Sequence, residues 1–262
     1  MALGGRLQLT WAHQLRYRQS VSLDHERLHW YRDTTPAYRL TAEHIIPSLL
    51  KPFARVTVEG LEHIPRTGPV ILAANHSDNL DAYLLMHLVP RTVHFAARPD
   101  AFGTGPLCTF WRWLGAFPAD AWGMRYALSL LDDGGVVGVF PQARISPELC
   151  DASGAVGLLA LRSGASIIPV AISGTETVHA TCALTKRASI SVQFGPPLTF
   201  VPSSPCRHRS QMVADEILRR VGVLLGEPRS SHAEPAPRVD GPTSRSHATT
   251  AGRTSGGVDG RG

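Results

Sequence analysis

The chain has 262 residues, 43% of them hydrophobic, which is enough for one sizeable domain with a hydrophobic core. Its net charge of +5 at pH 7 fits an anionic partner, such as a membrane surface, a phosphorylated lipid or a nucleic acid. The four cysteines are widely spaced, so neither a zinc site nor a disulfide framework is expected. No apolar run approaches the roughly 18 residues of a membrane-spanning helix, and the first residues lack the apolar core of a signal peptide.

Composition divides the chain into three regions. Residues 1–36 are polar with scattered arginines, and we expect a partly ordered basic arm there. Residues 37–227 alternate apolar and polar segments and form the expected folded domain. In residues 228–262 the only sizeable apolar side chains are two valines, too few to offset the entropy cost of ordering. We therefore expect a disordered C-terminal tail.

Short segments rich in β-branched residues, bounded by Gly, Pro or polar residues, predict strands. In chain order these are 55–59, 70–74, 92–96, 115–118, 136–140, 167–172 and 189–194. Segments typical of helices are 38–52, 79–89, 105–114, 123–133, 154–164 and 207–226. This alternation predicts an α/β fold with a single domain, in which a mostly parallel or mixed sheet is flanked by helices.

The strand at 70–74 leads directly into a histidine and an aspartate, in the sequence VILAANHSDNLD. His76 and Asp81 are five residues apart, so one regular helix would place them about 140° apart, whereas a turn would let them meet. A carboxylate on one ring nitrogen would fix the tautomer and leave the other nitrogen to accept a proton from a hydroxyl. The spacing alone is also compatible with a capping aspartate and an incidental histidine.

Three further segments follow in order: RPDAFGTGPLCTFWRWLGAFPAD at 98–120, VVGVFPQARIS at 136–146 and SGASIIPVAISGTE at 163–176. With the histidine segment, this order resembles the glycerolipid acyltransferase family, of the 1-acylglycerol-3-phosphate O-acyltransferase type. Members of that family carry four motifs in this order along the chain: N-H-x-x-x-x-D, G-x-[IF]-P, F-P-E-G-x-R-like and V-P-[VA]. The resemblance covers roughly 56–176 and implies that the domain at 37–227 is an acyltransferase domain.

The resemblance also implies roles for individual residues. His76 would be the general base that deprotonates the acceptor hydroxyl, and Asp81 would orient it. Arg144 fits the F-P-E-G-R-[IS] variant of the third motif, whereas the commoner register would place Ile145 at the arginine position. We favour Arg144, helped by Arg98, as the residue that would hold the acceptor phosphate, because a guanidinium can bind phosphate through two hydrogen bonds and isoleucine cannot. The residues expected to contact substrate are Asn75, Ser77, Arg98, Phe140, Pro141, Gln142, Ala143 and Arg144.

The third motif departs from the family pattern at two positions. Gln142 stands where the family has glutamate, and Ala143 stands where it has glycine. The amide can still form hydrogen bonds, whereas the alanine adds a Cβ where close backbone approach matters. These changes leave the identity of the acceptor open.

The expected reaction moves a fatty acyl group from acyl-CoA or acyl-carrier protein to a lysophospholipid hydroxyl, with 1-acylglycerol-3-phosphate as the expected acceptor. No metal or bound cofactor is expected. We expect the protein to lie peripherally on the cytoplasmic face of a membrane, and we expect no nucleic-acid partner, because the arginines are scattered. Two alternatives stay open: an acceptor that is another lipid or a natural-product hydroxyl, and a lipid-binding family member without activity.

Two aromatic or amphipathic segments allow two interpretations each. Phe110, Trp111, Trp113 and Phe117 fit either a wall of the acyl groove or membrane surface, or ordinary core packing. The segment 38–56 fits either an interfacial helix or a helix packed on the domain, and its prolines at positions 47 and 52 are expected to interrupt it.

Overall fold

The computed structural model describes residues 35–102, 106–146, 148–178 and 187–226. The expected C-terminal tail and nearly all of the expected basic arm lie outside the described residues. All described residues belong to one compact unit.

In the described part of the chain, seven strands form one sheet with the order β1-β7-β6-β2-β5-β3-β4. The strands are β1 (Ala54–Glu59), β2 (Val70–Ala74), β3 (Val93–Ala97), β4 (Phe117–Pro118), β5 (Val136–Val139), β6 (Ser166–Ser173) and β7 (Ala188–Phe194). β6 and β7 pair antiparallel, and every other neighbouring pair is parallel. The predicted mixed α/β fold is therefore confirmed, and each predicted strand is present, although the one at 115–118 is shortened to two residues.

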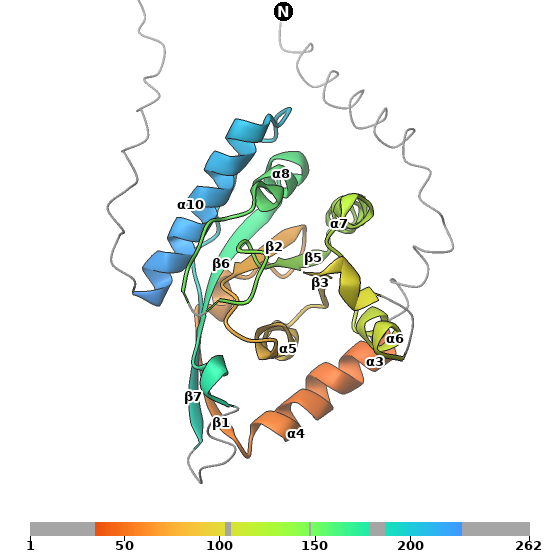
Figure 1. Cartoon of the computed structure of the whole chain (residues 1–262), viewed down its shortest axis with the longest axis vertical. Helices are drawn as coiled ribbons and strands as arrows, with labels where there is room; N and C mark the ends of the chain where they lie inside the picture. The colour runs from red at the N-terminus through yellow and green to blue at the C-terminus, as the bar shows by residue number, and fades with distance from the viewer. Residues whose placement is uncertain (1–34, 103–105, 147, 179–186, 227–262) are drawn as a thin grey trace, which may run out of the picture. The chain divides into compact units, whose positions relative to one another are not determined.

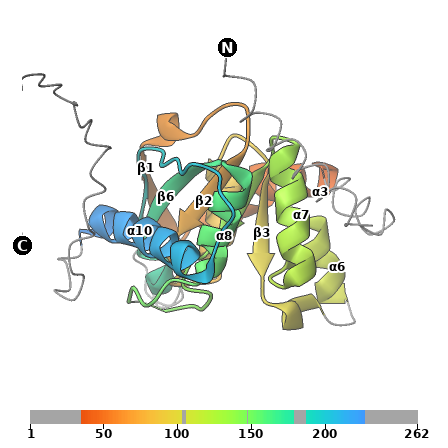
Figure 2. The ribbon, with the colours of Figure 1, turned by 90° about the horizontal axis from the view of Figure 1, so that it is seen from above.

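Helices cover both faces of this sheet (Figures 1 and 2). The main helices are α3 (Thr35–Leu40), α4 (Ile46–Leu50), α5 (Leu80–Leu88), α6 (Pro106–Trp113), α7 (Ala121–Asp132), α8 (Gly154–Ser163) and α10 (Arg207–Leu225). Short helical turns are η1 (Thr41–Ile45), η2 (Leu61–His63), η3 (Pro99–Phe102) and η4 (Thr175–Thr177). None of the helices in the described residues combines the length and the apolar character that a membrane crossing requires.

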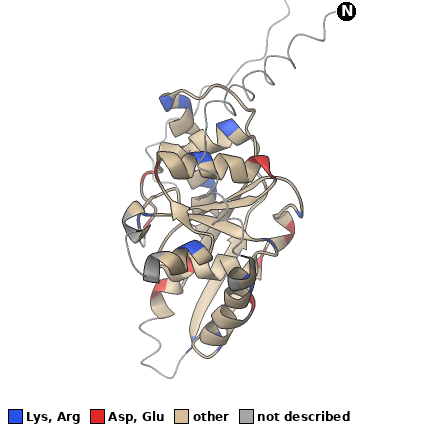
Figure 3. Ribbon diagram, turned by 90° about the vertical axis from the view of Figure 1, so that its right-hand side faces the viewer, with Lys and Arg blue, Asp and Glu red and all other residues tan. Residues whose placement is uncertain are grey.

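The apolar central strands form a core on each side of the sheet. Alternate residues of a strand point to opposite faces, so Leu72 of β2 packs towards α4 and α5, whereas Ile71 packs towards α7, α8 and α10. Both side chains are completely buried. The central strands β6, β2, β5 and β3 carry no Lys, Arg, Asp or Glu, and neither do β7 and β4, so the charged residues of the described chain lie on helices, connections and the edge strand β1 (Figure 3). Strands buried on both faces are typical of parallel sheets.

The chain from residue 35 to residue 50 is helical throughout, although Pro47 was expected to interrupt it. Proline has no N–H to donate within a helix. The helix widens into the π turn η1 just before it, where the N–H of Ile46 bonds the Thr41 carbonyl. This wider turn accommodates the proline in the helix, and α4 continues to Leu50.

Candidate active site

The turn between β2 and α5 brings the predicted histidine and aspartate together. β2 ends at Ala74, and α5 begins at Leu80, so that Asp81 lies in its first turn. The His76 Nδ1 atom is 3.0 Å from the Asp81 Oδ2 atom. The sequence predicted that these two side chains could meet if a turn lay between them, and the structure has both the turn and the contact.

The Asp81 side chain is fully buried and receives hydrogen bonds from several sides. Its Oδ2 accepts from the backbone N–H groups of Ser77 and Asp78, at 2.8 and 2.9 Å. Its Oδ1 accepts from the Thr175 hydroxyl, at 2.7 Å. A carboxylate in this setting only accepts hydrogen bonds, so His76 Nδ1 carries the ring proton and donates a hydrogen bond to Asp81, which leaves Nε2 as a proton acceptor. Thr175 lies in a segment that the sequence analysis identified, but the residue itself was missed.

An aromatic ring stacks on the face of the His76 imidazole. The Phe140 ring stacks on His76 with the ring centres 3.9 Å apart and the planes within 12°. The Phe95 ring in turn stacks on the Phe140 ring, with the ring centres 5.7 Å apart. Gly138 makes room for it, because a Cβ there would lie 2.3 Å from the Phe95 ring. Phe140 was predicted as a site residue, whereas Phe95 and Gly138 were not.

Asn75 ties the end of β2 to its neighbour β6. Its Nδ2 donates to the Ile172 carbonyl and its Oδ1 accepts from the Ile172 N–H, both at 2.8 Å. Nδ2 also lies 3.3 Å from the Ser77 hydroxyl. These bonds continue the β2–β6 pairing by one side chain and fix the point where the histidine leaves the sheet. The predicted contacts of Asn75 and Ser77 with substrate stay predictions.

The loop after β5 clamps the backbone of His76. The Gln142 Oε1 atom accepts from the His76 N–H at 3.3 Å, and the Ser146 N–H donates to the His76 carbonyl at 2.8 Å. Gln142 is buried, and its Nε2 donates to the Glu148 carbonyl at 2.8 Å. Its side chain therefore serves the interior of the loop, and Gln142 is absent from the lining of the pocket described below. Its predicted contact with substrate stays a prediction.

Ala143 adopts a backbone conformation that favours glycine. Its φ of 53° is the one positive φ of a non-glycine among the described residues. Side chains with a Cβ enter this left-handed region at a cost of about 1–2 kcal/mol. This is the position at which the family pattern has glycine, so the departure noted in the sequence introduces local backbone strain.

A cavity of about 890 Å³ opens beside His76 and runs between α7 and α8. The predicted site residues that line it are His76, Arg98, Phe140, Pro141, Ala143 and Arg144. Arg125 of α7 and Arg162 of α8 also line it, and the sequence analysis missed both. The acidic lining residue Asp120 caps α7 by accepting from the Gly123 N–H at 2.8 Å. The cavity therefore has a predominantly cationic set of charges.

Most of the remaining cavity wall is apolar. Trp111, Phe117, Met124 and Leu159 are among the side chains that form it. Trp111 and Phe117 thus serve the cavity, whereas Phe110 and Trp113 on the same stretch are 39% and 52% exposed. Phe117 is also 2% exposed and part of the hydrophobic core, so core packing fits this residue, whereas the exposure of Phe110 and Trp113 does not fit core packing.

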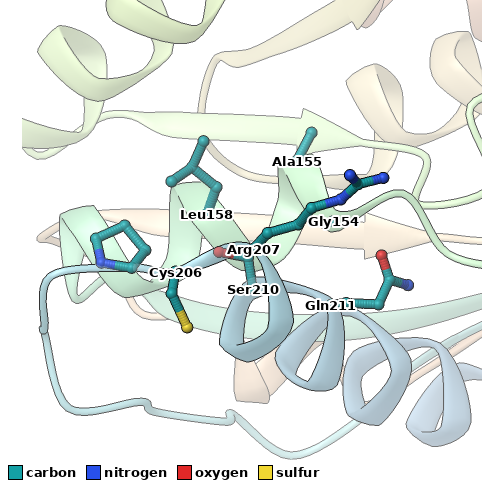
Figure 4. A pocket seen from close by; sticks show the side chains of 8 residues that line it. Gly154, Ala155, Leu158, Cys206, Arg207, Ser210 and Gln211 are labelled. Carbon is teal, nitrogen blue, oxygen red and sulfur yellow. The ribbon is translucent and has the colours of Figure 1, made fainter.

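A second cavity, of about 390 Å³, lies where the first turns of α8 and α10 meet (Figure 4). It shares Ala155 and Leu158 with the larger cavity but contains neither His76 nor Asp81. Among the described residues, no three His, Cys, Asp or Glu side chains gather in a way that would hold a metal ion. The larger cavity is therefore the candidate active site.

Comparison with known proteins shows which family model and which proteins this chain resembles. Residues 55–173 match the family model described as Acyltransferase. The 1-acyl-sn-glycerol-3-phosphate acyltransferase of Bacillus subtilis (strain 168) is 27% identical over 150 residues, which are 55% of this chain and 73% of that protein. The crystal structure of the 1-acyl-sn-glycerophosphate (LPA) acyltransferase PlsC from Thermotoga maritima shares the fold, with a TM-score of 0.52, 20% sequence identity, and coverage of 82% of this chain and 89% of that chain. The chain thus carries a region, residues 55–173, that matches the acyltransferase family model, and His76 and Asp81 both lie within it.

Proposed function

We propose that the protein transfers a fatty acyl group from a thioester donor, acyl-CoA or acyl-carrier protein, to the hydroxyl of 1-acylglycerol-3-phosphate. The observation that carries this proposal is the His76–Asp81 contact of 3.0 Å at the wall of a cavity with cationic and apolar linings. The names of the relatives from Bacillus subtilis and Thermotoga maritima support the choice of acceptor.

The chemistry needs one base and no covalent intermediate on the protein. His76 Nε2 takes the proton of the acceptor hydroxyl, and the oxygen attacks the carbonyl carbon of the thioester. An ester C–O bond forms, the C–S bond breaks, and the imidazolium returns the proton to the departing thiolate. Asp81 holds the tautomer and stabilises the imidazolium, and a positioned base of this kind typically contributes about 10² to 10⁴ in rate. The reaction written this way uses no metal or bound cofactor.

The cavity lining has charged and apolar side chains that suit different parts of the substrates. Arg144 and Arg98 supply guanidinium groups for the acceptor phosphate, which bind phosphate well because their planar N–H pairs match two oxygens. Apolar side chains such as Met124 and Leu159 suit the fatty chains. A substrate with a charged head and an apolar tail fits both sets of groups.

An exposed apolar stripe supports a peripheral position on a membrane surface. The helical segment 35–50 buries one face on the domain, yet it leaves a second apolar face in solvent. Its large apolar side chains are Leu40, Ile45 and Leu49, which are 55%, 43% and 64% exposed, and the adjoining Phe53 is 43% exposed. The cations Arg39 and Lys51 lie in and just after the same segment. Apolar side chains with nearby cations are typical of helices that lie in the lipid interface.

A panel of acceptors tests the proposal. Purified protein receives oleoyl-CoA or oleoyl-carrier protein, together with lysophosphatidate, lysophosphatidylcholine or monoacylglycerol, and free thiol and lipid product are measured. We expect lysophosphatidate to react fastest, with one phosphatidate formed for each thiol released. Equal rates with a neutral acceptor would refute the choice of acceptor and favour the alternative of another lipid or natural-product hydroxyl. Binding of lysophosphatidate without release of thiol would identify an inactive lipid-binding protein.

A further inference from the structure

The Cys150 sulfur lies between two residues of the motif loop. The Arg144 Nε–H donates to the Cys150 Sγ atom, with a separation of 3.1 Å. The Gln142 Nε2 group donates to the same sulfur at 3.2 Å. Cys150 therefore joins the arginine at the cavity to the buried amide behind it, and the sequence analysis gave it no role.

This sulfur is connected to the histidine through one further side chain. The Gln142 Nε2 group donates to the Cys150 sulfur, and the Gln142 Oε1 atom accepts from the backbone N–H of His76. A glutamate at this position could not donate to the sulfur or to the Glu148 carbonyl, because a carboxylate carries no hydrogen to donate. The departure from the family pattern at Gln142 is thus matched by a cysteine that accepts from it.

The charges around the sulfur favour its thiolate form. Burial by itself raises the pKa of the Cys150 thiol, but hydrogen bonds from Gln142, Arg144 and Ser146 and the positive charge of Arg144 lower it below its ordinary value. The hydrogen bond to Cys150 in turn raises the pKa of Arg144, and the negative charge of Asp151 adds to this. A thiolate is a stronger hydrogen-bond acceptor than a thiol, so the contact tightens when the thiol ionises.

We propose that Cys150 is a positioning residue that holds Arg144 by its Nε–H and directs the two terminal nitrogens of the guanidinium to the acceptor phosphate. Arg144 lines the cavity and is otherwise a long, exposed side chain. Once Nε is occupied, the Nη1 and Nη2 groups form the edge that can bind two phosphate oxygens. The proposal rests on the proposed function, because it assigns the phosphate to the acceptor of that reaction.

The first experiment measures equilibrium binding at monomeric lipid concentrations. Lysophosphatidate and its neutral counterpart, monoacylglycerol, are titrated into the wild type, Cys150→Ala and Cys150→Ser. Because a hydrogen bond to a charged group is lost, Cys150→Ala should weaken lysophosphatidate binding about tenfold and leave monoacylglycerol binding unchanged. Serine keeps an acceptor and should restore part of the affinity. Cys206→Ser changes a free cysteine outside the larger cavity and should bind both lipids as the wild type does.

Turnover separates positioning from a general structural role. In Cys150→Ala we expect the KM for lysophosphatidate to rise about tenfold, while kcat and the KM for oleoyl-CoA stay unchanged. Equal lysophosphatidate affinity in the wild type and Cys150→Ala would overturn the proposal. Equal weakening of both lipids would also overturn it, because the loop would then have lost its shape.

A third measurement does not depend on the acceptor. The rate of Cys150 alkylation is followed against pH by peptide mass spectrometry, in the wild type and in Arg144→Gln. Pairing with the guanidinium predicts that the titration of Cys150 moves to higher pH in the variant, and an unchanged titration would overturn the pairing. A wild type that fails to distinguish lysophosphatidate from monoacylglycerol would refute the proposed acceptor, while this titration would still decide whether Cys150 holds Arg144.

Discussion

Asp81 is fully buried, and the hydrogen bonds that it accepts come from its own turn and from Thr175. A buried carboxylate is stable only when hydrogen bonds or cations replace its lost hydration. Here three donors besides His76 supply that replacement. The aspartate therefore serves both the turn and the imidazole, and its removal should affect the histidine more strongly than the fold of distant elements.

Replacement of Asp81 by Asn tests this role. The amide keeps the size of the side chain, but it removes the negative charge that the proposed mechanism needs to stabilise the His76 imidazolium. We expect kcat for acyl transfer to fall about 10²- to 10⁴-fold, in line with loss of the base. Thr175→Val is the matched control, because it removes one hydrogen bond from Asp81 and leaves the carboxylate in place. If kcat fell equally in the Thr175→Val and Asp81→Asn variants, this result would contradict a special role of the carboxylate.

At the scale of elements, strand β5 supports the histidine from a distance. Gly138 lies in this strand and faces the Phe95 ring, which stacks on Phe140, which in turn stacks on His76. Two phenyl rings therefore connect the position of the strand to the His76 imidazole. Local sequence patterns do not reveal this path, because Phe95 of β3 and Phe140, which directly follows β5, are far apart in the chain.

Replacement of Gly138 by Ala should shift this stack. The new Cβ would lie 2.3 Å from the Phe95 ring, which must move. Overpacking of a core typically costs about 1–3 kcal/mol in free energy of unfolding, and we expect kcat to fall as well. Denaturant unfolding and turnover measure the two effects. The pair Gly138→Ala with Phe95→Leu should recover part of both losses; if the double variant is no better than the single one, the stack does not transmit the change.

The helical segment 35–50 gives a prediction for the membrane surface. Leu49 is 64% exposed on the outer apolar face, so Leu49→Glu should leave the fold intact and weaken binding to anionic lipid vesicles. Loss of one leucine from the lipid corresponds to about 1.5–3 kcal/mol, or at least about tenfold in affinity. Val201→Glu is the matched control, because Val201 is 78% exposed in the connection between β7 and α10. Vesicle co-sedimentation that drops equally for both variants, or for neither, would argue against this face.

At the scale of the whole molecule, buried His94 links stability to pH. Its Nδ1–H donates to the Gly115 carbonyl at 3.1 Å, and its ring packs edge-on against Tyr126. Burial lowers the pKa of His94 below its ordinary 6.5, although the hydrogen bond to Gly115 opposes this shift. The unfolded chain therefore binds the proton more readily than the folded one. The free energy of unfolding should fall as the pH drops below about 6.5, until the folded pKa is passed.

Urea unfolding at pH 7.5 and at pH 5.5 tests this linkage. The wild type should lose more stability between these two values than His94→Gln, which cannot titrate. Other groups contribute equally to both proteins, so the difference between the two losses isolates His94. Equal losses would show that His94 does not govern this part of the pH dependence.

The sequence predicts the elements of the fold better than their arrangement. β2 at residues 70–74 matches the prediction to the residue, because a short apolar run bounded by proline and asparagine has clear limits. The order of the seven strands and the antiparallel pairing of β6 with β7 depend on contacts between distant segments, which local patterns do not contain. The predicted break at Pro47 was wrong for a similar reason: a π turn can absorb a proline when the helix packs on a core.

The candidate site divides in the same way. His76 and Asp81 are close in sequence, so their meeting was predictable once a turn was assumed. Thr175 comes to Asp81 from 94 positions away, and Cys150 contacts Arg144 through a loop whose shape no periodicity predicts. Side chains that act through tertiary contacts are therefore the ones that the sequence analysis missed.

The central claim is that His76 is the base for acyl transfer to 1-acylglycerol-3-phosphate. The most direct test compares the wild type with His76→Ala in the presence of oleoyl-CoA and 1-acylglycerol-3-phosphate, with free thiol and phosphatidate measured together and thermal unfolding recorded for both proteins. We predict equal amounts of thiol and phosphatidate from the wild type, a rate about 10²- to 10⁴-fold lower in the variant, and similar unfolding temperatures. Phosphatidate formed by His76→Ala at the wild-type rate would contradict the claim.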